Sequence, residues 1–264
     1  MNSGSVWSKL SLASCGRLVT QDSSEEPAIN LLESISKEKE RLVTEKKIRN
    51  PKSLPPIGDE EIKTQIPENW LLRRLGEVSI AITKGATPTT YGFAYQSSGV
   101  SFIKVENIAD GRIHRSGLSE FIGDDAHEAF GRSQLQAGDV LFSIAGTIGK
   151  TCIVREEDLP ANTNQALAIV RGTSTVFEPQ YLQNVLDSAV SEWMHEKARG
   201  GAMKNVSLGD LTNLPVPIPP MPEQRRIVAK VRELTALCDD LEARLECARD
   251  TRSAFARSAV ACFA

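Results

Sequence analysis

A glycine-rich turn that ends in lysine and threonine is the feature of this 264-residue chain closest to known enzymatic chemistry. Residues 145–151 read AGTIGKT after an apolar run, and a Gly-Lys-Thr ending is typical of loops that bind nucleotide phosphates. That pattern requires a first glycine where this chain has Ile144, and a helix after the threonine, whereas the run CIV at 152–154 predicts a strand. We therefore expect a strand–turn–strand element here and no nucleotide hydrolysis.

The other groupings that could do chemistry are weaker still. Glu45 and Lys47 have the E-x-K spacing of nuclease sites, but they lie in a charged helical pattern with no companion aspartate on a strand. The histidines at 114, 127 and 195 lack the serine or cysteine context of a catalytic triad. The five cysteines form no C-x-x-C pair and have no histidine at metal-ligand spacing. We expect a non-catalytic protein without a metal site or a cofactor.

The elements that must position any binding residues are mostly short strands. Runs rich in apolar and β-branched residues, separated by Gly, Asn or Asp, predict strands at 77–83, 100–105, 140–144, 151–154 and 166–171. One helix is expected over 179–199. These patterns predict an α+β domain on a predominantly antiparallel sheet, flanked by long helices of the coiled-coil type.

The clearest boundary lies at 214–231, which reads LPVPIPPMPEQRRIVAKV. Its first four prolines cannot be helix interior, whereas Pro222 suits a first helical position. Apolar residues then recur at alternating steps of four and three, which predicts a long helix that packs along another helix. The positions expected to form this contact are Ile227, Val231, Leu234, Cys238, Leu241, Leu245 and Phe255.

Five segments are expected along the chain. They are a helix tail or frayed N-terminus at 1–21, a charged amphipathic helix at 22–50, a Pro-rich linker at 51–65, an α+β domain at 66–220 and the heptad helix at 221–264. Ser23 and Glu26 have the spacing of a capping box that opens the charged helix. No apolar run is long enough to span a membrane and no clean signal peptide is present, so we expect a cytoplasmic protein.

Four stretches carry a family resemblance: IPENW at 66–70, GDVLF at 138–142, GGAMKN at 200–205 and PIPPMPEQRRIVAKV at 217–231. Their order and spacing resemble the DNA-specificity subunit of type I restriction-modification enzymes, over nearly the whole chain. The resemblance implies a target recognition domain that reads a half-site of an interrupted double-stranded DNA sequence. It also implies methyltransferase subunits docked on the helices, and a motor–nuclease subunit for restriction.

A single recognition domain is expected here, whereas normal family members carry two. Residues 16–22 (GRLVTQD) resemble a segment that in the family follows the long helix, but here they precede the domain. The chain therefore resembles a half-length subunit or a truncated product, and a half-length subunit would restore the pair as a homodimer through its long helices.

The candidate DNA contacts are loop residues that donate or accept hydrogen bonds, since such groups read base edges and bind phosphates. They are Lys84, Thr87, Thr89, Lys104, Asn107, Arg112, Ser143, Thr147, Lys150, Asn162, Asn164, Gln165, Lys204 and Asn205. The residues of the loop at 83–91 could equally form a polar turn, Asn107 and Asn162 suit Asx or other turns, and Gly200 suits a helix C-cap.

The charge balance argues against tight DNA binding by this chain alone. The formal net charge is −3, and residues 66–220 hold 13 Lys and Arg against 17 Asp and Glu. Either the positive charges gather on one face or a partner subunit supplies most phosphate contacts. The same balance supports the alternative function, a coiled-coil adaptor with a β-rich ligand-binding domain.

Overall fold

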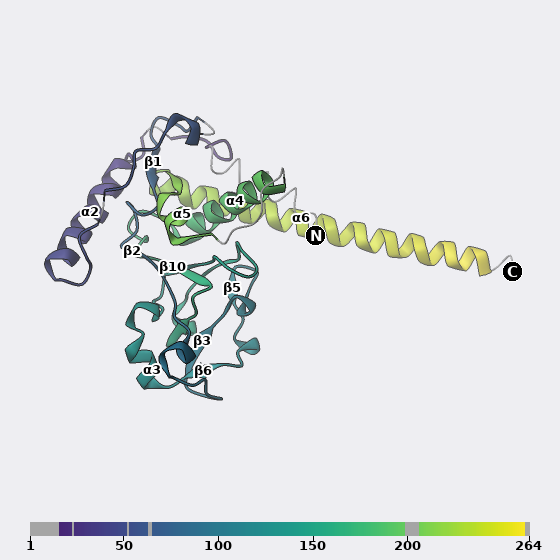
Figure 1. Cartoon of the computed structure of the whole chain (residues 1–264). Coiled ribbons are helices and arrows are strands. Elements are labelled where there is room, and N and C mark those ends of the chain that lie inside the picture. The colour runs from purple at the N-terminus through teal and green to yellow at the C-terminus, as the bar shows by residue number, and fades with distance from the viewer. Residues whose placement is uncertain (1–15, 23, 52, 63–64, 199–205, 262–264) are drawn as a thin grey trace.

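The computed structural model describes residues 16–261 except 23, 52, 63–64 and 199–205, with backbone alone for 191–198 and 255–261. Figure 1 shows a layer of helices above a mainly β lobe, with α2 and α6 extending from it in opposite directions. The helices are α2 (Ile29–Thr44), α3 (Asp124–Ala129), α4 (Pro179–Ala198), α5 (Leu208–Asn213) and α6 (Met221–Ala261). The strands are β1 (Leu71–Arg74), β2 (Ala81–Lys84), β3 (Val100–Ile103), β4 (Ile108–Ala109), β5 (Arg112–Ile113), β6 (Phe121–Ile122), β7 (Val140–Ser143), β8 (Thr151–Ile153), β9 (Ala161–Thr163), β10 (Leu167–Arg171) and β11 (Pro215–Ile218). The predicted α+β class with mainly antiparallel sheets is confirmed.

A four-stranded antiparallel sheet, in the order β2-β10-β7-β8, separates two hydrophobic cores. Val140, Phe142 and Val170 point into the core that includes α4, α5 and the start of α6. The alternating residues Leu141 and Ile169 point into a second core on the opposite face. Because the central strands are buried on both faces, their sequences are continuous apolar runs, which is why the strands were predictable.

A smaller sheet lies in the β lobe, in the order β6-β3-β9. Its β3–β9 pair is parallel, an exception to the antiparallel pattern. Val100, Phe102, Ile122, Ala126 and Phe130 form a third cluster between this sheet and α3. The strand β9 was not predicted, because its residues (ANT) are small or polar and were interpreted as a loop.

Prolines are accommodated in β11, which forms a two-stranded sheet with β1. Pro215 and Pro217 lack an amide donor, and proline is tolerated in strands of this kind, which have no partner on one side. The carbonyl of Pro217 accepts a hydrogen bond of 3.1 Å from the Tyr181 hydroxyl of α4. The proline run therefore ends the domain in extended form, and α6 begins at Met221.

The start of α6 is held by a buried carboxylate. Glu223 is fully buried and accepts hydrogen bonds from Trp70 Nε1 (2.9 Å) and Gln21 Nε2 (2.5 Å). Burial raises the pKa of this carboxyl, and the two hydrogen bonds oppose that rise. One turn later, Arg226 pairs with Glu25. These contacts attach the N-terminal segment to the helix that follows the domain.

The charged helix starts later than its capping box indicates. Ala28 is the N-cap of α2 and makes no side-chain capping bond, while the Ser24 hydroxyl donates to Asp22 and Ser23 lies outside the described residues. The start of the helix instead follows Pro27, and the helix is anchored to the domain by the buried Ala28 and Ile35. The expected start near Ser23 is therefore corrected to Ile29.

Among the described residues, no helix is sufficiently long and apolar to cross a membrane.

A buried ion pair holds β7 and β10 in register. Arg171, the last residue of β10, donates from Nη2 and Nε to the Asp139 carboxylate at 2.6 Å and 2.9 Å. Asp139 immediately precedes β7, and Val140 pairs with Val170. A slip of one residue would exchange the two faces of each strand between the cores and break this pair.

We expect Asp139→Asn to lower the free energy of unfolding by about 3 kcal/mol, because it leaves the Arg171 guanidinium without its buried counter-charge. Denaturant unfolding followed by circular dichroism measures the change. Arg155→Gln is the control: it removes an exposed pair with Glu157 and should cost less than about 1 kcal/mol. Equal losses in the two variants would contradict the assigned role of Asp139.

Candidate nucleic-acid interface

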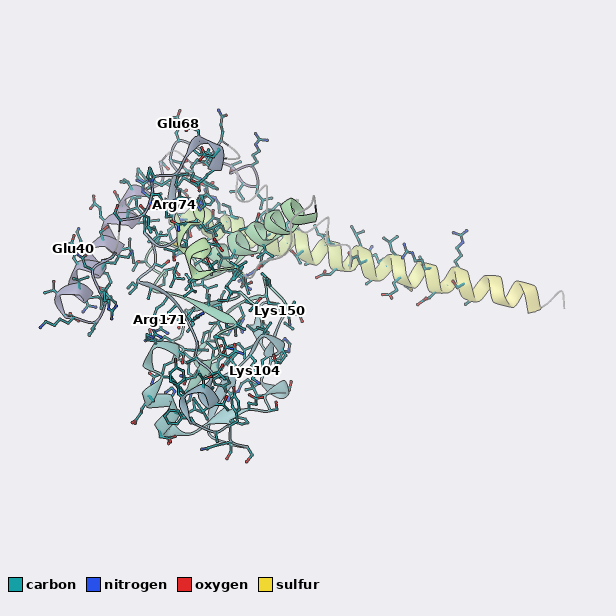
Figure 2. The ribbon with its side chains drawn as sticks, in the orientation of Figure 1. Glu40, Glu68, Arg74, Lys104, Lys150 and Arg171 are labelled. Atoms are coloured by element: carbon teal, nitrogen blue, oxygen red, sulfur yellow. The ribbon has the colours of Figure 1, made fainter. Side chains whose placement is uncertain are left out.

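Three polar loops converge at one end of the four-stranded sheet. β2 ends at Lys84 and β7 at Ser143, and both lie opposite the start of β10 at Leu167 and Ala168. Because neighbouring strands are antiparallel, residues 84–91, 144–150 and 164–166 all leave the sheet at this end. We call these three segments the loop edge. Arg171 and Lys150 mark the two opposite ends of the sheet in Figure 2.

The loops of this edge are packed against one another. A Cβ at Gly85 would lie 1.9 Å from the carbonyl oxygen of Thr163, so the close approach requires glycine. The Thr87 hydroxyl donates to the Gln165 side chain, and the Ile144 amide donates to Ala166 O at 2.8 Å. These contacts fix the relative positions of the exposed side chains.

Several predicted contact residues point to solvent on this surface. Lys84, Thr89, Thr147 and Gln165 are exposed, and Thr87 and Asn164 are half-buried. Asn164 Oδ1 accepts a hydrogen bond of 3.1 Å from the Ala166 amide, the Asx-turn geometry that was the alternative for this loop. The loop edge carries no Asp or Glu among its residues.

The structure uses three predicted contact residues inside the fold. Asn162 is fully buried in β9, where it bonds Ser133 Oγ (3.0 Å) and the His127 ring. Asn107 is buried and accepts from the Lys104 amide at 2.8 Å, and its amide nitrogen donates to Gly117 O. Ser143 is buried and bridges Thr147 O and the Lys150 amide. Because their polar atoms are already paired in the interior, we leave these three out of the interface.

Two other predicted lysines, Lys150 and Lys104, have internal partners. Lys150 Nζ donates to Val105 O (3.2 Å) and Ile108 O (2.8 Å), and so ties the β7–β8 turn to the neighbouring segment. Lys104 pairs with Glu120 and lies 5.2 Å from the centre of the Tyr95 ring. Arg112 is exposed, but on β5 and not on the loop edge. Lys204 and Asn205 lie outside the described residues.

The turn at 145–151 has the strand–turn–strand form expected of it. β8 begins at Thr151, directly after Lys150, where a nucleotide-binding loop would continue as a helix. The described residues contain no group of three or more His, Cys, Asp and Glu side chains arranged to hold a metal ion.

A half-buried carboxylate supports the base of this turn. Asp187 of α4 accepts a hydrogen bond of 2.6 Å from Thr151 Oγ1, and Gln183 Nε2 donates to the same hydroxyl at 3.0 Å. Burial raises the pKa of Asp187 to about 6, against the smaller lowering effect of the Thr151 hydrogen bond.

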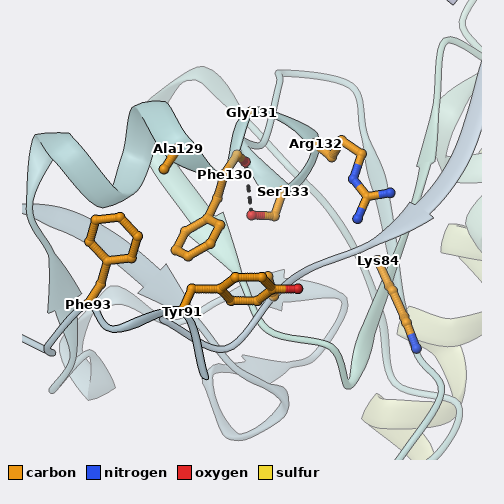
Figure 3. Close-up of a pocket in the computed structure, with 9 residues that line it drawn as sticks. Lys84, Tyr91, Phe93, Ala129, Phe130, Gly131, Arg132 and Ser133 are labelled. Atoms are coloured by element: carbon orange, nitrogen blue, oxygen red, sulfur yellow. Dashed lines mark hydrogen bonds between the residues drawn. The ribbon is translucent and has the colours of Figure 1, made fainter. Parts of the chain in front are cut away.

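Two exposed residues here were not among the predicted contacts: Tyr91, the last residue of the first segment of the loop edge, and Arg132, which lies outside the loop edge. Tyr91 and Arg132 line a pocket of about 550 Å³ together with Lys84, Phe93 and Phe130 (Figure 3). Aromatic residues make up 5% of the chain, yet three of them occur at 91, 93 and 95. That local enrichment was the available signal for Tyr91, whereas Arg132 has none because the fold alone brings it here.

The fold and this surface together define a small α+β recognition domain with a long helix leaving it. A family model described as "Type I restriction modification DNA specificity domain" matches residues 67–247. The chain therefore belongs to the type I restriction-modification DNA specificity domain family.

Curated relatives extend the similarity to most of the chain. The EcoAI specificity subunit of Escherichia coli is 31% identical over 247 residues, which cover 92% of this chain and 41% of that protein. The EcoEI specificity subunit of Escherichia coli is 26% identical, over 92% of this chain and 42% of that protein. The chain thus spans about two fifths of the length of these relatives.

A solved structure shows the same fold. It comes from a study titled "Structural basis underlying complex assembly and conformational transition of the type I R-M system". The match has a TM-score of 0.52 and 22% identity, and covers 81% of this chain and 48% of that one.

The Asp187 carboxyl predicts a pH dependence of stability. Since its folded pKa lies above the unfolded value, the charged form opposes folding above about pH 6, and this penalty is relieved as the pH falls toward 4. We expect Asp187→Asn, which keeps an acceptor for Thr151, to be more stable than the wild type by about 2 kcal/mol at pH 8. Near pH 4 the two proteins should be equal.

Thermal unfolding at pH 8, 6 and 4 measures this difference. Asp239→Asn, at an exposed position of α6, is the control and should match the wild type at each pH. A stability gap for Asp187→Asn that stays constant with pH would contradict the assignment.

Proposed function

We propose that this chain reads a half-site of an interrupted DNA sequence as the recognition component of a type I restriction-modification complex. The observation that carries the proposal is the charge distribution on the loop edge. Residues 66–220 are acidic in total, but the three segments of the loop edge contain the exposed Lys84 and no carboxylate. This separation of charge favours contact with phosphates, and membership of the DNA specificity domain family supports DNA as the ligand.

Base reading in this proposal falls to the exposed polar side chains. Gln165, Thr147 and Thr89 can donate to or accept from base edges in the major groove, and Lys84 can contact a phosphate. Because the loops are packed together, these groups approach the DNA as one preorganised surface. Lys204 and Asn205 remain proposed DNA contacts because they lie in a glycine-rich basic segment of the sequence.

The chain itself carries out no chemistry in this account. Methyltransferase subunits docked on its helices would modify a base in each half-site, and a motor–nuclease subunit would be needed for restriction. The named relatives are specificity subunits of type I restriction enzymes, and the chain resembles about two fifths of each. An interrupted site has two halves, so a second recognition domain would read the other half-site.

Selection from a random pool of double-stranded DNA tests the proposal. The full chain is incubated with the pool, with and without a cognate methyltransferase subunit, and retained DNA is sequenced. We expect an interrupted motif with two short half-sites. Absence of enrichment even with the methyltransferase subunit would contradict the proposal and favour the adaptor function.

The salt dependence of DNA binding then tests whether Lys84 on the loop edge contacts a phosphate. Lys84→Gln should weaken binding of the enriched duplex and reduce the slope of log K against log salt by about 1, since one phosphate contact is lost. The control is Lys37→Gln on α2, whose side chain is exposed and lies 3.9 Å from Glu33. The control should keep the wild-type slope, and equal slopes in all three proteins would exclude Lys84 from the interface.

The long helix is proposed to pair with a second helix. Ile227 and Val231 of the predicted seam are buried in the domain, and Leu234 and Cys238 are half-buried. Leu237, Leu241 and Leu245 are 53%, 57% and 59% exposed along the part of α6 that extends beyond the domain. The Phe255 side chain lies outside the described residues. With 41 residues α6 is about 60 Å long, so a paired helix would hold two domains well apart.

We expect the isolated chain to form a dimer in which this leucine stripe is covered. Leu241→Glu combined with Leu245→Glu should raise the dimer dissociation constant at least about 10-fold, because charges replace buried leucines. Sedimentation equilibrium measures it, with Ala236→Glu plus Ala243→Glu, exposed and off the seam, as the control. A monomeric wild type, or a dimer unaffected by the leucine substitutions, would contradict homodimerisation through α6.

A further inference from the structure

The pocket beside the loop edge has an aromatic end and a cationic end. Phe130 is the central ring, with Tyr91 and Phe93 each edge-on to it at centroid distances of 5.3 Å. Phe130 is 9% exposed and belongs to the third core cluster, whereas Tyr91 is 62% exposed. Tyr91 therefore extends the core outward and offers an aromatic surface to a ligand.

Two cations lie at the other end. Figure 3 shows Lys84 and Arg132 on the side of the pocket toward which the Tyr91 hydroxyl points. Both are exposed, and neither has an ion pair or a side-chain hydrogen bond with another described residue. A pocket of about 550 Å³ is within the range that binds small ligands and cofactors.

This arrangement matches the chemistry of one nucleotide, which joins a flat base to a phosphate. Aromatic rings bind a base that has left the stack, and lysine and arginine bind the adjoining phosphates. The pocket is continuous with the loop edge, since Lys84 and Tyr91 belong to its first segment.

We infer that the pocket receives one unstacked base of the bound DNA, with Tyr91 in contact with the base and Lys84 and Arg132 on its flanking phosphates. This inference rests on the proposed DNA-reading function. Leaving the stack costs least at a mismatched or weakly paired position, so the pocket adds selectivity for the sequence at that position.

A mismatch scan of the enriched duplex tests the inference. Each base pair is replaced in turn by a mismatch, and affinities are measured for the full chain with its methyltransferase subunit. We expect one position at which the mismatch tightens wild-type binding by about 3- to 30-fold, because the unpairing cost is already met. Tyr91→Ala should abolish that gain and weaken binding of the matched duplex by about 5- to 100-fold.

Conservative variants distinguish loss of the aromatic contact from damage to the fold. Tyr91→Phe keeps the aromatic surface and should bind within about 3-fold of the wild type. Arg132→Gln should weaken binding of every sequence, whereas the matched control Arg155→Gln, at an exposed arginine that pairs with Glu157, should not. Unchanged binding by Tyr91→Ala together with a flat mismatch scan would overturn the inference and leave the proposed function intact.

Two further outcomes would also overturn it. If the wild-type complex enriches no DNA, the proposed function fails and the inference fails with it. If free deoxyadenosine or thymidine 5′-monophosphate binds the wild type but not Tyr91→Ala, while DNA binding is equal in both, the pocket is a site for free nucleotides.

Discussion

The ion pair between Arg171 and Asp139 holds the two central strands of the four-stranded sheet in register, and the positions of both cores and of the loop edge follow from that register. Strand residues alternate between two buried faces, so a slip by one residue would place each side chain in the wrong core. The pair lies at the end of the sheet away from the loop edge. The end that is proposed to contact DNA is thus free of the charges that fix the register.

Polar residues in this domain divide into those that support the loops and strands from inside and those that are exposed on the loop edge. Ser143 closes the β7–β8 turn through hydrogen bonds to main-chain groups, Lys150 ties the turn to the carbonyl of Ile108, and Thr147 at the tip remains exposed. Asn162 likewise links β9 to the segment that carries Phe130 and Ser133. The same residue types serve both purposes, because amides and hydroxyls satisfy buried backbone groups as well as they read base edges.

The sequence allowed the fold class, five of the strands, α4 and the start of α6 to be predicted, since these depend on local apolar patterns and prolines. It did not allow buried amide side chains to be distinguished from exposed ones. The residues NTNQ at 162–165 look alike in the sequence, but Asn162 is buried because of partners about thirty residues away in the chain. The absence of Asp and Glu from the loop edge was also hidden, because its three segments are separated in the sequence and meet only in the folded domain. Arg132 was missed for the same reason, whereas the aromatic residues at 91, 93 and 95 were a local signal for Tyr91.

Site-specific photocrosslinking to DNA tests the central claim that the loop edge is the contact surface. A photoreactive amino acid is placed at Thr147 or Gln165 on the loop edge, and at Ala137 or Ser174, which are exposed at the opposite end of the sheet. Each protein is irradiated with the duplex that the wild-type complex retains. The account predicts crosslinks from Thr147 and Gln165 and none from Ala137 or Ser174. Crosslinks confined to Ala137 and Ser174 would contradict it.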